Sequence, residues 1–486
     1  MHLRRLSRLS IRQAWGLAPG LLAALLMAAT AQAQAPGGSA PPVARTQAAP
    51  PLAPASATVP EVPGAAPAGA TDPQAAAPVS RDARRVYETS RAKLVQIRTL
   101  LRNTNTQTSV GSGFFVAGPG LIVTNFHVAS QLALDPERHR GVYVPVDGKE
   151  GEVELLAFDV THDLAVLRVK SAEAGASWPV LDFRPEPEPL SQGDRIYSLG
   201  NPLDIGFAVM EGTFNGLVQR SFYPRIFFGG ALNPGMSGGP ALDDQGRVIG
   251  VNVAKRLDGE QVSFLIPAGF AQALLARAAG AQPITRAAHA EVARQLLAHQ
   301  GLVAGRFMAS PLRTQRHGGY AVPVPDDALA RCWGAGRTPD ARSFSVERTD
   351  CQVDSHVFAG DFNTGFLRLR YEAYDAPNLG QLRFAMLHSA SFRNEAFAVR
   401  GSRHKTPAEC TERYIEQAGM PMRAVICFTG YRKLPGLYDV SVLVATLNQP
   451  TQGVQGRLDA QGVSFDNGLK MVQHYLAGFR WEGGKP

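Results

Sequence analysis

The segment Asn233-Pro234-Gly235-Met236-Ser237-Gly238-Gly239-Pro240 decides how this sequence is interpreted. Three glycines and two prolines surround a single serine within eight residues. This composition predicts a tight, irregular backbone, because glycine adopts conformations that other residues rarely reach. Such a backbone can present a hydroxyl and its neighbouring N–H groups to one point, so Ser237 is a candidate nucleophile.

Two upstream segments contain a candidate base and a candidate carboxylate. His127 lies at the end of the strand candidate that includes the apolar residues Ile122 and Val123, and Asp163 precedes the apolar stretch Leu164–Leu167. Alone, the histidine at a strand end or the aspartate in a turn is more often structural. A serine attacks a carbonyl only when an imidazole takes its proton and a carboxylate orients that imidazole. The order His, Asp, Ser, with separations of 36 and 74 residues, lets the first two come from one β-barrel and Ser237 from the next.

The region around these residues predicts a mainly β fold. Short apolar stretches are separated by Gly, Pro and Asp clusters, which is typical of an all-β barrel or sandwich. A short helix is expected over 81–91 and a closing helix over 268–279. The expected strands are Leu94–Leu101, Gly113–Val116, Ile122–Asn125, Gly141–Val146, Glu152–Phe158, Ala165–Val169, Asp194–Leu199 and Val248–Val253.

Six ordered blocks resemble the trypsin-like serine endopeptidases of the chymotrypsin fold, and most closely the HtrA/Deg group of bacterial envelope proteases. The blocks are Gly111-Ser112-Gly113, Val123–Val128, Asp163–Val166, Gly200-Asn201-Pro202, Asn233–Pro240 and Val248–Asn252. The stretch Ser263–Pro267 resembles the last barrel strand of that family. The resemblance covers roughly residues 85–280 and implies two antiparallel β-barrels of the six-stranded type.

The resemblance also implies roles for individual residues. His127 would be the general base, Asp163 would orient it, and Ser237 would be the nucleophile. The backbone N–H groups of Gly235 and Ser237 would form the oxyanion hole. The residue before the nucleophile is Met236, where the HtrA group usually has Asn. Because a methionine cannot make the hydrogen bonds of an asparagine, a latent or non-catalytic binding or chaperone scaffold is an alternative interpretation.

The same resemblance indicates a primary substrate pocket. Ala231, six residues before Ser237, would lie at its floor and offers no carboxylate for a substrate Lys or Arg. The walls would come from Val251-Asn252-Val253 and Ser263-Phe264-Leu265, so we expect a small or medium apolar side chain before the scissile bond. The loop Asn201–Arg225 resembles the regulatory loops of the family and fits an ordinary surface connection equally well.

Residues 1–33 have the layout of a secretory signal peptide. An apolar run over Trp15–Thr30 is followed by Ala31-Gln32-Ala33. The 16-residue run is shorter than the roughly 20 residues of a membrane span, so we expect cleavage, and an uncleaved anchor is the alternative. Cleavage removes four positive charges and lowers the formal net charge from +8 to +4, which leaves no located basic patch and no case for a nucleic-acid partner. The arginines removed are Arg4, Arg5, Arg8 and Arg12.

Residues 34–80 predict a disordered linker. Fifteen of these 47 residues are Ala, 11 are Pro and none is aromatic. Too few large apolar groups are present to offset the entropy of ordering, and the prolines favour extended backbone. A segment that orders on a partner such as a cell-wall polymer is the alternative.

The last third of the chain predicts an α+β domain over residues 305–486, joined to the protease domain (81–280) by a helical connector (281–304). No Gly-Leu-Gly-Phe-like carboxylate-binding loop occurs, so a PDZ module is not expected. Substrate recruitment, inhibition and envelope attachment all fit this domain. The arginines on its exposed strand face fit solvated charge or an anionic polymer. The expected elements are a helix over 284–303, strands over 366–374, 381–387 and 438–447, and a helix over 464–478.

All four cysteines lie in this last domain, and an even set in an exported chain predicts disulfides. Three pairings are possible, and the sequential one is favoured because each bond would close a short loop. The spacing does not match a zinc site, and neither a metal nor a cofactor is expected. The cysteines are Cys332, Cys351, Cys410 and Cys427.

These features together predict an exported, ATP-independent serine endopeptidase, periplasmic or secreted. Its substrates, implied by the resemblance, would be unfolded or exposed segments of envelope proteins. A dedicated processing protease controlled by the C-terminal domain is a further interpretation. A composition of 45% apolar and 19% charged residues excludes a wholly disordered, collagenous or polytopic membrane protein, and it does not specify an oligomeric state.

Overall fold

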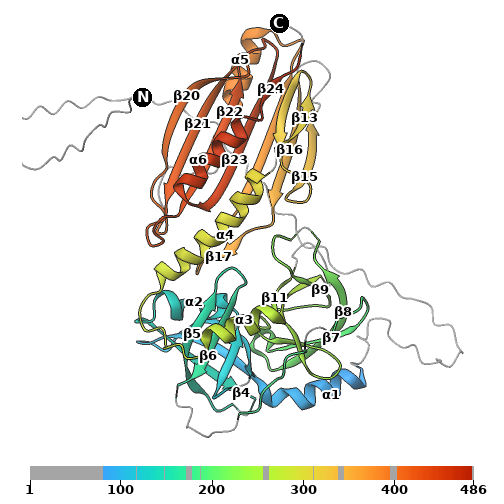
Figure 1. Ribbon diagram of the computed structural model, residues 1–486, viewed down its shortest axis with the longest axis vertical. Helices are drawn as coiled ribbons and strands as arrows, with labels where there is room; N and C mark the ends of the chain where they lie inside the picture. Colours follow the sequence, from blue (N-terminus) through green and yellow to red (C-terminus); the bar gives the residue numbers. More distant parts are fainter. Residues whose placement is uncertain are drawn as a thin grey trace, which may run out of the picture. The chain divides into compact units, whose positions relative to one another are not determined.

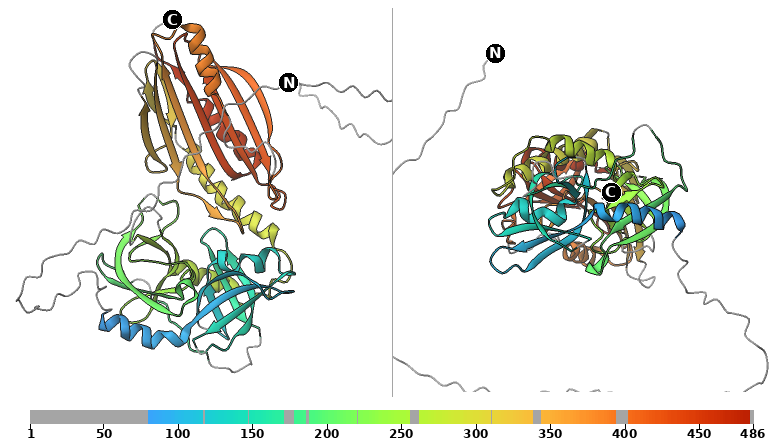
Figure 2. Two further views of the ribbon diagram at one scale, coloured as in Figure 1. Left: turned by 180° about the vertical axis from the view of Figure 1, so that it is seen from behind. Right: turned by 90° about the horizontal axis from the view of Figure 1, so that it is seen from below.

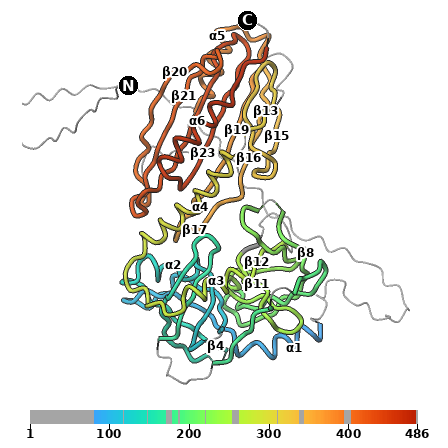
Figure 3. The backbone as a smooth tube through the Cα atoms, in the orientation of Figure 1, coloured from blue at the N-terminus to red at the C-terminus, as the bar shows by residue number. Residues whose placement is uncertain are grey.

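The computed structural model describes residues 80–483, apart from 117, 147, 171–177, 186–187, 220, 256–261, 310, 338–343 and 394–401. The predicted signal peptide, and the predicted linker up to residue 79, lie outside the described residues. Residues 94–267 contain two closed antiparallel β-barrels (Figure 1). Figure 3 traces the chain from the first barrel, in blue to teal, into the second, in green.

The first barrel contains the candidate base and carboxylate. Its strands follow the order β1-β2-β3-β6-β5-β4 around the barrel. Their bounds are β1 (Leu94–Leu101), β2 (Gln107–Val116), β3 (Leu121–Thr124), β4 (His139–Pro145), β5 (Gly151–Asp159) and β6 (Leu164–Val169). All six had been predicted at these places, and the boundaries differ by a few residues.

The second barrel contains the candidate nucleophile. Its strands follow the order β10-β11-β12-β9-β8-β7. Their bounds are β7 (Arg195–Gly200), β8 (Ala208–Leu217), β9 (Ile226–Gly229), β10 (Pro240–Leu242), β11 (Val248–Lys255) and β12 (Ser263–Pro267). The strands β8, β9 and β10 were not predicted. In β8 the first nine residues are all half-buried, so the alternation that marks a strand in a sequence is missing.

Helices of this region cover and connect the barrels. Helix α1 (Arg81–Ser90) buries Ala83, Val86 and Ser90, a helical spacing, and Ser80 caps it by accepting the Ala83 N–H at 3.0 Å. Apolar side chains from both barrels and from α1 form one core cluster between them. The other elements are η1 (Arg91–Lys93), α2 (Phe126–Leu134), η2 (Pro202–Asp204) and α3 (Ala268–Ala278).

The C-terminal region is α+β, as predicted. Its largest element is a seven-stranded antiparallel sheet with the order β15-β16-β19-β23-β22-β21-β20. The strands are β15 (Arg331–Arg337), β16 (Ser345–Val353), β19 (Leu367–Asp375), β20 (Glu409–Gln417), β21 (Met420–Gly430), β22 (Tyr438–Thr446) and β23 (Gln452–Val463). Smaller sheets are formed by β13 (Arg313–His317), β14 (Tyr320–Val324) and β24 (Arg480–Trp481), and by the hairpin of β17 (Val357–Phe358) and β18 (Asn363–Thr364).

Three helices belong to this region: α4 (His289–Ala309), α5 (Gln381–Ser391) and α6 (Phe465–Leu476). Helix α6 lies across one face of the large sheet (Figure 1), and the strands lie in front of it when the molecule is seen from behind (Figure 2). The prediction of a strand over 381–387 is wrong, because this segment is α5. It buries Phe384 and His388, four residues apart on one helix face. The helix predicted over 284–303 begins later, at His289, and ends later, at Ala309.

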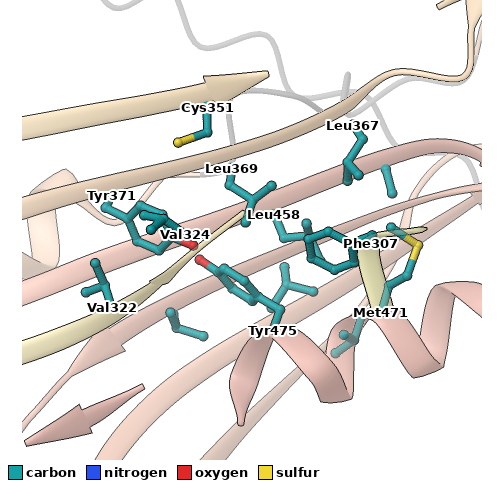
Figure 4. Packing of buried hydrophobic residues seen from close by; sticks show 14 of the residues in the cluster. Phe307, Val322, Val324, Cys351, Leu367, Leu369, Tyr371, Leu458, Met471 and Tyr475 are labelled. Carbon is teal, nitrogen blue, oxygen red and sulfur yellow. The ribbon is translucent and has the colours of Figure 1, made fainter. Parts of the chain in front are cut away.

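The large sheet and α6 enclose the C-terminal core. Figure 4 shows Tyr371 and Leu369 of β19 facing Tyr475 and Met471 of α6. The sequential disulfides are present: Cys332–Cys351 joins opposed residues of β15 and β16, and Cys410–Cys427 joins opposed residues of β20 and β21.

The C-terminal region and the barrels share apolar cores within one compact unit, residues 76–486. One cluster combines Phe126 and Leu132 of α2 with Val357 of β17 and with Tyr431 and Leu434, which follow β21. Among the described residues we find no helix that is both long enough and apolar enough to cross a membrane.

Candidate active site

One carboxylate fixes both the ring and the backbone of His127. The structure places this histidine in the first turn of helix α2, and not at a strand end as the sequence had suggested. The Nδ1 atom of its ring lies 2.6 Å from Oδ2 of Asp163, and its backbone N–H donates to Oδ1 at 2.8 Å. The Asp163 carbonyl accepts from the Phe126 N–H and from the Asn125 side chain. Asp163 therefore also satisfies the free N–H groups at the start of α2.

The surroundings of His127 favour its charged form. Burial of the ring by itself lowers the pKa of His127, but the charge and the hydrogen bond of the Asp163 carboxylate outweigh burial and hold the pKa above its ordinary value. The histidine side chain remains 29% exposed, so it is accessible to a bound substrate. A histidine in this environment can take a proton and be stabilised as an imidazolium.

The Ser237 segment lies directly against the first barrel. The Ser112 N–H donates to the Ser237 carbonyl at 2.7 Å. Gly111 lies between α2 and this segment, because a Cβ at residue 111 would meet Cγ2 of Val128 at 2.4 Å and the Ser237 carbonyl oxygen at 3.0 Å. The close approach requires glycine, and it brings Ser237 beside the residue that follows His127.

The Ser237 hydroxyl has a backbone partner in the structure. It donates to the carbonyl of Val253 at 3.4 Å, a long hydrogen bond. Within the described part of the chain, no hydrogen bond joins this hydroxyl to the His127 ring. The three residues are thus gathered at one place, with the His–Asp pair formed and the Ser–His pair not formed.

The backbone before Ser237 forms a turn that directs its N–H groups. The Met236 N–H donates to the Asn233 carbonyl at 3.1 Å, with proline second in the turn and Gly235 third, at a φ of +94°. These are the features of a type II turn. The Pro234 carbonyl accepts from the Leu203 N–H at 2.8 Å. Since carbonyl and N–H point in opposite directions across a trans peptide, the Gly235 N–H is directed away from Leu203.

Ser112 braces this turn through its side chain. Its hydroxyl donates to the Gly235 carbonyl at 2.7 Å and accepts the Asn201 N–H at 2.9 Å. Within the described residues, the N–H groups of Gly235 and Ser237 make no hydrogen bond to protein. Both are therefore available to an oxyanion. The sequence contained a signal for Ser112, the Gly-Ser-Gly block, but its role could not be assigned before the strands were placed.

Met236 is held by burial and not by hydrogen bonds of its side chain. It is 0% exposed and packs in the core of the second barrel with Ile196, Phe228, Leu232 and Leu265. An apolar side chain at this position fixes the turn from inside the barrel. Met236 therefore lacks the hydrogen bonds of an asparagine side chain and is held by apolar packing instead.

Three of the predicted pocket residues remain at the surface of the second barrel. Ala231 is exposed, and Val253 and Phe264 are half-buried. Val253 lies beside Ser237 through the hydrogen bond to its carbonyl. Phe264 pairs with Phe227 on the neighbouring strand.

The other two predicted pocket residues, Val251 and Asn252, are buried. Val251 is fully buried in the core between the barrels. The Asn252 side chain accepts from the Ser198 hydroxyl at 2.8 Å and donates to the carbonyls of Leu199 and Met236 at 2.9 and 3.2 Å. Asn252 therefore supports the backbone next to Ser237, and the pocket prediction narrows to Ala231, Val253 and Phe264.

The described residues contain no group of three or more His, Cys, Asp or Glu side chains placed to hold a metal ion. The site is thus built from a serine, an imidazole paired with a carboxylate, and two free backbone N–H groups. This arrangement can perform acyl transfer, with the serine as acceptor of the acyl group.

Comparison with known proteins finds similarity in the region of the two barrels. Residues 111–251 match the family model of the trypsin-like peptidase domain. A protein of Bartonella henselae named "Probable periplasmic serine endoprotease DegP-like" is 35% identical over 153 residues, which are 30% of this chain and 27% of that protein. "Protease Do-like 1, chloroplastic" of Arabidopsis thaliana is 32% identical over 159 residues, 30% of this chain and 33% of that protein.

These alignments span less than half the length of the curated relatives, from 27% to 41%. Among solved structures, the serine endoprotease from Yersinia pestis is 22% identical with a TM-score of 0.35, covering 42% of this chain and 68% of that one. The sequence alignments with these relatives cover 30% to 34% of this chain.

Proposed function

We propose that the protein is a serine endopeptidase that works through an acyl-enzyme. His127 takes the proton of the Ser237 hydroxyl as its oxygen attacks the substrate carbonyl, and the N–H groups of Gly235 and Ser237 stabilise the oxyanion. The protonated His127 gives its proton to the leaving amine, and water then hydrolyses the acyl-enzyme with His127 as base. Asp163 holds the imidazole in the tautomer that this sequence requires.

The observation that carries this proposal is the pairing of His127 with Asp163 beside the Ser237 turn, whose two N–H groups are free. The similarity of residues 111–251 to trypsin-like peptidases supports it independently.

Export completes the proposed function. The signal-like residues 1–33, the two disulfides and the relatives whose names include the word periplasmic support a periplasmic or secreted enzyme. We propose that it acts without ATP on unfolded or exposed segments of envelope proteins. Pocket residues Ala231, Val253 and Phe264 favour a small or medium apolar side chain before the scissile bond.

One observation favours a second candidate, a latent form of the same site. The Ser237 hydroxyl donates to the Val253 carbonyl, and the Ser–His hydrogen bond is not formed. In this case substrate or a partner would have to turn the hydroxyl toward His127. A scaffold without catalysis would keep the same hydroxyl unreactive under all conditions.

A serine-reactive fluorophosphonate separates these functions. We expect the exported form to gain the mass of one phosphonyl adduct, and the Ser237→Ala variant to gain none. Casein cleavage should disappear in the same variant, and Ser109→Ala, at another hydroxyl in strand β2 of the first barrel, should keep it. Equal labelling of wild type and Ser237→Ala contradicts the mechanism, and labelling that appears only with an unfolded substrate present identifies the latent form.

A further inference from the structure

The hairpin β17–β18 is firmly fixed at its base in the C-terminal region. Before it, the Ser355 carbonyl accepts from Nε2 of His299 in α4 at 2.8 Å, and the Ser355 hydroxyl donates to the Gly365 carbonyl at 2.7 Å. At its end, the hydroxyls of Thr364 and Tyr431 are 2.5 Å apart, and Thr364 is fully buried. The hairpin is thus a rigid projection of the C-terminal region.

The tip of this hairpin rests on the helix that contains His127. The hydroxyl of Ser130, in the next turn of α2, donates to the Gly360 carbonyl at 3.2 Å. A Cβ at Gly360 would meet Cδ1 of Leu134 at 2.2 Å, and the Gly360 φ is +131°. Val357 and Ala359 are buried against α2 in the shared core. The contact between hairpin and helix is therefore close and specific.

Between these buried residues, Phe358 points to the candidate base. Its ring centroid lies 6.1 Å from that of His127, with the rings at 81° to each other, an edge-to-face contact. Phe358 is only half-buried, although it stands between two buried neighbours on the strand. Phe358 is therefore not sealed into the core as its two neighbours are.

We propose that Phe358 forms one wall of the substrate cleft, so that the C-terminal region contributes a specificity-determining residue. The inference rests on the proposed function. A peptide whose carbonyl carbon reaches Ser237 must lie within hydrogen-bond distance of the His127 ring. A side chain flanking the scissile bond then contacts whatever stands next to that ring, and this is the aromatic face of Phe358. The wall selects an apolar side chain over a carboxylate, because an aromatic ring offers a buried carboxylate no hydrogen-bond donor.

The test compares fluorogenic peptides that differ only in the residues on either side of the scissile bond, with Leu, Ala or Asp at each place. Phe358→Ala removes the ring, and Phe358→Leu keeps an apolar side chain of similar size in case the alanine variant is unstable. Phe362→Ala is the matched control, because this ring belongs to the same hairpin and contacts His404 and Tyr431.

We expect wild type and Phe362→Ala to favour Leu over Asp at one of the two places, and Phe358→Ala to lose about ten-fold of that preference in kcat/KM. The ratio between two peptides is informative, since a disturbance of His127 alone lowers both rates equally. Gly360→Ala, which pushes the hairpin away from α2, should cause the same loss. Gly419→Ala should not, because Gly419 also has a positive φ but no atom within 4 Å of a Cβ.

The experiments distinguish a failure of the Phe358 proposal from a failure of the proposed function. If the fluorophosphonate labels Ser237 and the peptide ratio of Phe358→Ala equals that of wild type, the role of Phe358 is overturned and the proposed function stands. If wild type is not labelled under any condition, the proposed function falls and the role of Phe358 falls with it.

Discussion

Asp163 performs two tasks with one carboxylate. One oxygen holds the His127 ring, and the other accepts the backbone N–H of the same residue at the start of α2. The residue has a φ of +53°, a conformation that Asp and Asn tolerate better than other side chains. An asparagine at this position can therefore keep the backbone and remove only the charge.

We expect Asp163→Asn to lower kcat by roughly four orders of magnitude, because the amide no longer stabilises the required tautomer and the imidazolium. The acid limb of the kcat/KM profile should also move to lower pH, because the carboxylate holds the pKa of His127 above its ordinary value. Initial rates between pH 5 and 9 measure both effects. An unchanged acid limb would mean that the limb does not report His127.

At the residue scale, the sequence indicates which side chains are candidates for catalysis, but it does not indicate which residues surround them. His127, Asp163 and Ser237 were chosen as candidates because the chemistry of acyl transfer demands those side chains in combination, and their catalytic roles stay a prediction. The burial of Val251 and Asn252 could not be predicted, because it depends on how β11 pairs with β10 and β12 in the second barrel. The contact of Phe358 with His127 had no sequence signal, since 231 residues separate them.

At the scale of elements, the turn between β8 and β9 joins the second barrel to α4. Phe222 is 8% exposed and belongs to the C-terminal core, with the Arg306 guanidinium over its ring. The next residue, Tyr223, forms a hydrogen bond of 2.8 Å with Nδ1 of His299. In the neutral ring the Nε2 of His299 donates to a carbonyl and its Nδ1 accepts from the tyrosine hydroxyl, so both ring nitrogens are satisfied without a charge.

This arrangement predicts acid sensitivity. Burial, together with the nearby His162, lowers the pKa of His299 to about 4. Between about pH 6.5 and 4 the unfolded chain binds a proton that the folded ring does not, so the free energy of unfolding falls as the pH falls. We expect this histidine to contribute roughly 2–3 kcal/mol of that loss. Urea unfolding at pH 7 and 4.5 should show a smaller loss in His299→Gln than in wild type. His356→Gln, at an exposed histidine, should behave as wild type does, and an equal loss in all three proteins would contradict the assignment.

Helices and strands were predicted correctly where the local sequence signals agree. The predictions failed where residues distant in the sequence determine the structure. Strand β1 was predicted with its observed bounds, because eight apolar-rich residues stand between clear breaks. Helix α2 was missed, because its first N–H groups are satisfied by Asp163 from another part of the barrel. For α5, the residues Gln, Leu, Arg, Ala and Met are all good helix formers, and this propensity contradicted the alternation that suggested a strand.

At the scale of the whole molecule, the barrels and the C-terminal region share two apolar clusters. Side chains of α2 and of the β17–β18 hairpin belong to one apolar cluster, and Phe222 of the second barrel belongs to another that lies mainly in the C-terminal sheet. Removing residues 305–486 would therefore expose apolar surface on both barrels.

We expect the full chain to unfold thermally in one cooperative transition, because each part buries apolar side chains of the other in two shared clusters. Differential scanning calorimetry measures this through the ratio of the calorimetric to the van't Hoff enthalpy, which should be close to one. Two resolved peaks would show that the shared clusters contribute little to stability.

The position of the β17–β18 hairpin in the sequence also affects the order in which the parts of the site are synthesised. A ribosome makes α2 and the Ser237 turn more than a hundred residues before it makes Phe358 and Tyr431. During this interval the apolar side of α2 lacks the residues that cover it in the finished molecule. If Phe358 forms a wall of the cleft as we propose, a growing chain contains His127, Asp163 and Ser237 before it contains that wall, and the proposed site is completed only near the end of synthesis.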